Sequence, residues 1–64
     1  MDALRSIDLE IEPGEVVNYS DIQFGNLEGA KLDHVRVHTF GMYAVIQLNG
    51  ITYTVPYGKL LKAT

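Results

Sequence analysis

The sequence predicts an all-β fold in which four or five short strands form a bent antiparallel sheet that closes as a small barrel. The chain has 64 residues and no cysteine, so one apolar core must stabilise a single domain over residues 1–64 without disulfides. Several segments alternate apolar and polar side chains, which is typical of half-buried strands. An Asn-Gly pair between two apolar segments is typical of a β-hairpin.

The first half of the chain predicts two strands and a loop. Residues 7–12 alternate apolar and acidic side chains without interruption, which predicts a strand that Pro13 and Gly14 end with a turn. Residues 15–19 predict a second short strand. Residues 20–29 contain serine, aspartate, asparagine and glycine, and this composition predicts a loop.

Residues 30–40 predict a further strand, which Gly41 ends. The apolar positions of this segment change phase in its middle, and such a change moves all later side chains to the opposite face of a strand. We therefore expect a β-bulge or a bend near Asp33 and His34.

The clearest local signal is the pair Asn49-Gly50, which tolerates the positive φ angles of a type I′ turn. A two-residue turn fixes the register of the strands on either side of it. The pairs on the apolar face are then Leu48–Ile51, Ile46–Tyr53 and Ala44–Val55, and those on the opposite face are Gln47–Thr52, Val45–Thr54 and Tyr43–Pro56. Pro56 should end the second strand. Residues 57–62 predict a single turn that packs Leu60 and Leu61 over the end of the barrel.

Some of these motifs resemble a known family. They are Pro13-Gly14-Glu15-Val16-Val17, residues 24–29, Phe40-Gly41 and residues 55–60. Together they resemble the KOW-containing SH3-like barrels at the C-terminus of NusG-family transcription factors and in some ribosomal proteins. The chain departs from that pattern at Ile22-Gln23, where the family has Gly-Pro, and at Ala30, where it has a branched residue. The resemblance implies an SH3-like barrel that recruits a partner in transcription or translation, and only Phe24 and Leu27 match its contact positions.

The charge of the chain bears on the class of partner. The formal net charge is −3, with the acids concentrated in residues 1–28, and a net acidic domain is not a typical nucleic-acid binder. No segment approaches the ~20 apolar residues of a membrane span, and the first residues lack the pattern of a secretory signal. We therefore expect a cytoplasmic protein. So short a chain is also compatible with a phage or viral origin.

Two clusters of polar side chains are candidates for chemistry. His34, Arg36 and His38 share one strand face, but at ~3.3 Å per residue the two histidines lie roughly 13 Å apart, too far to share a metal ion. We interpret this cluster as a solvated strand face. The acidic cluster of the first predicted strand is interpreted in the same way and consists of Asp8, Glu10 and Glu12. The sequence has no catalytic triad, phosphate-binding loop or zinc spacing, so we expect no enzyme activity, metal or cofactor.

The chain has six aromatic side chains. They either cover the ends of the barrel or, where so small a barrel cannot bury them, serve as interface anchors, a role in which aromatics are favoured. The candidate partner-binding residues are Tyr43, Tyr57, Phe24, Leu27 and Tyr19, with a second candidate face at Asp8, Glu10 and Glu12. We expect a non-enzymatic protein-binding module, either an adaptor or, if phage-encoded, an inhibitor of a host macromolecular machine.

Two alternative functions stay open. One is a nucleic-acid-associated barrel that uses exposed tyrosines and the cations Lys31, Arg36, Lys59 and Lys62. The other is a structural homo-oligomer, such as a homodimer, formed through an exposed edge of the first or second predicted strand.

Overall fold

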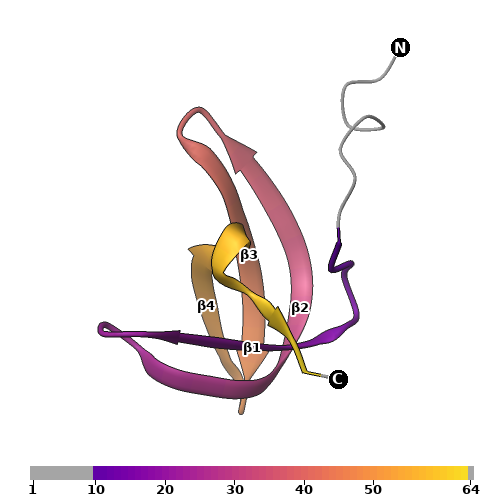
Figure 1. The fold of residues 1–64 in the computed structure, drawn as a ribbon. Coiled ribbons are helices and arrows are strands. Elements are labelled where there is room, and N and C mark those ends of the chain that lie inside the picture. The colour runs from indigo at the N-terminus through magenta and orange to yellow at the C-terminus, as the bar shows by residue number, and fades with distance from the viewer. Residues whose placement is uncertain (1–9, 64) are drawn as a thin grey trace.

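The computed structural model describes residues 10–63, which form one antiparallel sheet of five strands (Figure 1). The elements in chain order are β1 (Val16–Asp21), β2 (Gly25–His38), β3 (Gly41–Leu48), β4 (Ile51–Pro56), the 3₁₀ turn η2 (Tyr57–Lys59) and β5 (Leu61–Lys62). The order across the sheet is β4-β3-β2-β1-β5. The predicted all-β antiparallel class is thus confirmed, but no pairing between the edge strands β4 and β5 closes the sheet.

The sheet bends along β2, because the two halves of this strand pair with different neighbours. Its first half pairs with β1 and its second half with β3, and Lys31 takes part in both pairings. The register of β2 against β3 shifts between Leu32 and His34, and that of β1 against β2 shifts between Val17 and Tyr19. β1 consequently crosses the lower end of the β2–β3–β4 layer (Figure 1). The phase change predicted near Asp33 is confirmed, and a bulge absorbs it.

The predicted hairpin is confirmed in turn type and in register. Asn49 has a φ of 53° and Gly50 a φ of 79°, as a type I′ turn requires. All six predicted cross-strand pairs occur, from Leu48–Ile51 to Tyr43–Pro56. Burial differs from the prediction at two positions: Val45, on the polar face, is only 6% exposed, whereas Ile51, on the apolar face, is 54% exposed.

The core lies on the concave side of the bent sheet. Its largest fully buried side chains come from four different strands: Val17, Leu32, Ile46 and Val55. Ile11 and Leu60 complete it from outside the sheet. Burial of apolar surface from every long strand is the main favourable contribution to the stability of a domain this small.

The loop predicted over residues 20–29 is wrong. β1 continues to Asp21 and β2 begins at Gly25, so only residues 22–24 form a turn. Polar side chains that favour loops bond across the β1–β2 pair instead: the Ser20 hydroxyl donates to Asn26 Oδ1 at 2.7 Å. Gly41 was expected to end the strand predicted over residues 30–40. That strand, β2, ends at His38, and Gly41 is the first residue of β3.

The N-terminal prediction fails in the part that can be compared. Residues 7–9 of the predicted first strand lie outside the described residues, and residues 10–12 are not in a strand. Ile11 is nevertheless buried, and the turn at Pro13-Gly14 is confirmed by a 3.1 Å bond from Glu15 N–H to the Glu12 carbonyl.

The C-terminal segment contains the expected single turn and, in addition, a strand. Leu60 is buried as predicted, but Leu61 is 67% exposed and does not cover the core. Leu61 instead begins β5, which pairs with β1 through Asn18–Leu61 and Val17–Lys62. The residues that the structure describes include no helix with the length and hydropathy of a membrane span.

Candidate functional site

Two of the five predicted partner-binding residues are core residues of the monomer. Tyr19 and Leu27 lie directly opposite each other in the β1–β2 pair and are 3% and 4% exposed. A side chain can anchor a partner only where the partner can reach it. The expectation that Tyr19 and Leu27 are surface residues is therefore wrong, and both are left out of the candidate site.

The Tyr19 hydroxyl has a structural role in the β1–β2 turn. It donates a hydrogen bond to Asp21, and Asp21 Oδ1 accepts the Phe24 N–H at 2.6 Å. The bond to Asp21, burial and the charge of Asp21 together raise the pKa of Tyr19 to about 12. The bonds from Phe24 and from Tyr19 hold the pKa of Asp21 below its ordinary value. This network fixes a turn and leaves the tyrosine neutral at physiological pH.

Tyr57 and Phe24 are also engaged within the monomer. Tyr57 is half-buried, and its hydroxyl accepts the Ile11 N–H and donates to the Ile11 carbonyl, both at 2.9 Å. Phe24 is 37% exposed and packs edge-on against Tyr53 with ring centroids 5.2 Å apart. Tyr53 belongs to the apolar face of the β3–β4 hairpin, so Phe24 does not join Tyr43 on the opposite face.

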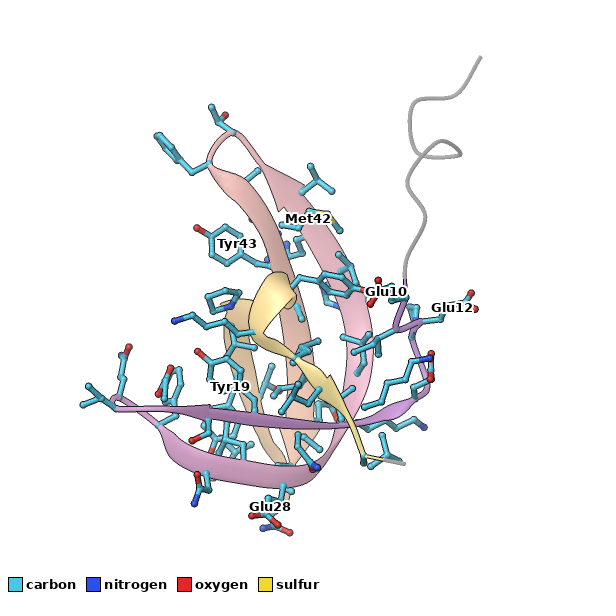
Figure 2. The ribbon with its side chains drawn as sticks, viewed as in Figure 1. Glu10, Glu12, Tyr19, Glu28, Met42 and Tyr43 are labelled. Carbon is cyan, nitrogen blue, oxygen red and sulfur yellow. The ribbon has the colours of Figure 1, made fainter. Side chains whose placement is uncertain are left out.

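Tyr43 is the predicted residue that remains available on the outer face of the sheet. It is half-buried and lies between Arg36 on β2 and Pro56 on β4, each directly opposite it. The His38 ring packs edge-on against the Tyr43 ring with centroids 5.4 Å apart. Figure 2 shows the Tyr43 side chain on the other side of the β2–β3 arm from Met42. Tyr43 does not belong to the core cluster, although Val45 on the same face is buried.

The tip of the β2–β3 arm carries an exposed apolar side chain. Phe40 lies in the two-residue turn between β2 and β3 and is 92% exposed. Fully exposed phenylalanine is unusual in a monomer, and exposed apolar residues with polar neighbours are typical of interaction surfaces. We call Arg36, His38, Phe40, Tyr43 and Pro56 the arm surface.

Sequence reasoning missed most of the arm surface. It treated Arg36 and His38 as a solvated strand face and assigned no particular role to Pro56. The pairing of residues 36 and 43 was not predicted because residues 39 and 40 form a turn without Asn-Gly or Gly-Asn chemistry. The alternation of Val35 and Val37 with Arg36 and His38 was the signal in the sequence that could have placed Arg36 and His38 on the outer face.

The four Lys and Arg residues within residues 10–63 come from three different elements. Lys31 and Arg36 lie on β2, Lys59 in η2 and Lys62 on β5. The charge of Lys59 helps to lower the pKa of Asp21, so it lies near an acid. On the β2 face, His34 Nδ1 lies 2.6 Å from Asp33 Oδ2, and both side chains are half exposed. Proteins that neutralise nucleic-acid backbones usually cluster Lys and Arg on one face.

The second candidate face is only partly described. Glu10 and Glu12 are exposed, in agreement with the solvated position expected of them, and Asp8 lies outside the described residues. Glu12 N–H donates to Glu15 Oε2 at 2.6 Å, which closes the turn at Pro13-Gly14. Within residues 10–63 no three histidine or acidic side chains are grouped as metal ligands would be.

Comparison of the chain with protein-family models, with curated proteins and with solved structures finds no match.

Proposed function

We propose that this domain is a non-catalytic protein-binding module, an adaptor or an inhibitor, that contacts its partner through the arm surface. One observation carries the proposal: Tyr43 is held between Arg36, Pro56 and the His38 ring on the face that does not supply the core. Tyrosine and arginine are the side chains most enriched among residues that dominate binding energy. Tyrosine also gives a large contact area at low entropic cost and a hydroxyl that can stay hydrated.

The position of the arm supports the same function. β2 and β3 pair without interruption from His34–Val45 to His38–Gly41, so the arm surface stands on regular strands. Rigid elements hold contact residues more accurately than loops do. Phe40, at the tip, extends the surface with an apolar ring that the monomer leaves in water.

At the level of fold, we infer a small SH3-like barrel related to the KOW type. The five antiparallel strands, the bend of the sheet at β2 and the 3₁₀ turn before β5 support this inference. A barrel would hide most strand edges and leave loops and hairpin tips as contact sites.

The test is capture of proteins from a lysate of the organism that encodes the chain, with Tyr43→Ala compared with the wild type. Truncation of an anchor typically costs 2 kcal/mol or more, so we expect at least about 30-fold weaker capture. The matched control is Gln47→Ala, because Gln47 is exposed on the same strand and the same face as Tyr43. Both variants should keep the wild-type melting temperature to within a few degrees.

The result distinguishes the competing functions. Equal capture by Tyr43→Ala and the wild type would contradict binding through the arm surface, and the face with Glu10 and Glu12 would become the next candidate site. Unfolding of Tyr43→Ala would show that Tyr43 is a core residue. Binding of RNA or DNA that weakens steeply with salt would favour the nucleic-acid alternative.

A further inference from the structure

β4 is an edge strand that lacks the usual protection of natural edges. The homo-oligomer predicted from the sequence used an edge of the strand predicted over residues 7–12 or over residues 15–19. The second of these corresponds to β1, where β5 pairs with Val17 and Asn18 on the side away from β2. The outermost strands in the sheet order are β4 and the two-residue β5, which includes Lys62, and β2 also has an unpaired side beyond Lys31, where it pairs with β3 alone. Edge strands are normally short, charged, bulged or covered. β4 has six residues, no charged side chain and no register shift against β3.

The register of the hairpin shows which main-chain groups face outward. In a two-residue hairpin the residues that flank the turn form a hydrogen-bonded pair, and such pairs alternate with non-bonded ones. Ile51, Tyr53 and Val55 therefore bond to β3, while the N–H and C=O groups of Thr52 and Thr54 point to the open edge. Among the described residues, no other strand pairs with this edge. Pro56 has the same parity as the threonines and lacks an N–H, which ends the edge.

The sequence of β4 is nearly symmetric about Tyr53, as Ile51-Thr52-Tyr53-Thr54-Val55. We propose that a second copy of this chain pairs with β4 in antiparallel orientation, about a two-fold axis at Tyr53. A two-fold interface brings the same segment of each copy together, so the segment must be complementary to itself. In this register, Thr52 lies opposite Thr54 of the second copy and exchanges both main-chain hydrogen bonds with it.

The side chains agree with this register on both faces. Threonine lies opposite threonine on the outer face, a favourable cross-strand pair. On the other face the half-buried Tyr53 lies opposite Tyr53 of the second copy, and Ile51, which is 54% exposed in the monomer, lies opposite the fully buried Val55. No like charges meet, because β4 has none. An extended segment of a different protein could pair with the same edge, but no feature of β4 favours such a segment. The near-symmetric sequence of β4 favours a second copy of β4.

The experiment combines sedimentation across concentrations with amide hydrogen exchange on the full chain. The wild type should sediment with twice the monomer mass at high concentration and dissociate on dilution. The amides of Thr52 and Thr54 should be protected in the dimer and should exchange rapidly in the dilute monomer, where they face water. Exchange at Tyr53, which bonds to β3, should change much less.

The matched variants are Thr54→Pro and Thr54→Val. Proline removes the outward N–H without removing a bond to β3, so the dimer dissociation constant should rise at least about tenfold while the fold is kept. Valine keeps the N–H and should leave the dimer intact. If Thr54→Pro does not fold, Thr52→Lys provides a second test by placing a charge at the same edge.

Three outcomes would overturn the proposal. The first is a monomer at millimolar concentration with rapid exchange at both threonines. The second is a dimer in which these amides stay unprotected, because another surface would then form it. The third is protection that appears only when a different protein is added.

Discussion

Replacement of Tyr57 by phenylalanine should destabilise the domain by about 1–3 kcal/mol. The Tyr57 hydroxyl accepts the Ile11 N–H and donates to the Ile11 carbonyl, both at 2.9 Å, and Ile11 is 6% exposed. Tyr57→Phe removes both bonds and leaves two poorly solvated main-chain groups without partners. A net value of about 0.5–1.5 kcal/mol for each hydrogen bond gives this range. A 64-residue domain has a total stability of about 3–10 kcal/mol, so the loss is a large fraction of it.

The assay is urea unfolding of the wild type, Tyr57→Phe and the control Tyr53→Phe. Like Tyr57, Tyr53 is half-buried and packs against the core cluster. None of the hydrogen bonds found among the described residues uses the Tyr53 hydroxyl. Tyr53→Phe should therefore cost clearly less than Tyr57→Phe. Exchange of the Ile11 amide should also accelerate in Tyr57→Phe alone. Equal free energies of unfolding for the two variants, with an unchanged Ile11 amide, would refute the role of the Tyr57 hydroxyl.

Two further predictions concern turns. Gly50→Val should lower the free energy of unfolding, measured by urea denaturation, by about 1–3 kcal/mol, because a β-branched residue resists the φ of 79° at Gly50. Asn49→Gly should lower it much less. Equal and small losses in both variants would argue against a type I′ turn. Since the pKa of Tyr19 is raised from 10.0 to about 12 in the folded state, its hydroxyl contributes stability that is complete below pH 10 and lost as pH rises toward 12. Urea unfolding at pH 8 to 12 should show this loss in the wild type and not in Tyr19→Phe.

Local chemistry explains which parts of the fold the sequence predicts correctly. The β3–β4 hairpin follows from Asn49-Gly50 alone, because turn type and register are set within a few residues. The bulge near Asp33 follows from a change of apolar phase within one segment. Tyr43 could be placed on the outer face from the same local register.

The failures come from pairings and contacts that the local composition does not signal. Residues 20–29 have loop composition, but they form strands because Asn26 and Leu27 pair with Ser20 and Tyr19, and polar side chains then bond across the pair. The same pairing buries Tyr19 and Leu27, which had been predicted to contact a partner. The alternation over residues 7–12 predicted a strand, but Ile11 obtains its main-chain partner from the Tyr57 side chain, 46 residues away, and residues 10–12 are not in a strand.

The arm surface and the β4 edge can be used at the same time, and their positions determine how the arm surfaces are arranged in the proposed dimer. Side chains on opposed strands of one sheet point to the same side, so Thr52 and Thr54 share the outer face with Tyr43. A two-fold axis at Tyr53 keeps this face continuous across both copies, which places two arm surfaces on one side of the dimer. A partner with two binding sites could then engage both, and the second contact would form at high effective concentration. A modest contact around a single Tyr43 would in that arrangement suffice for tight capture of a symmetric or repetitive partner.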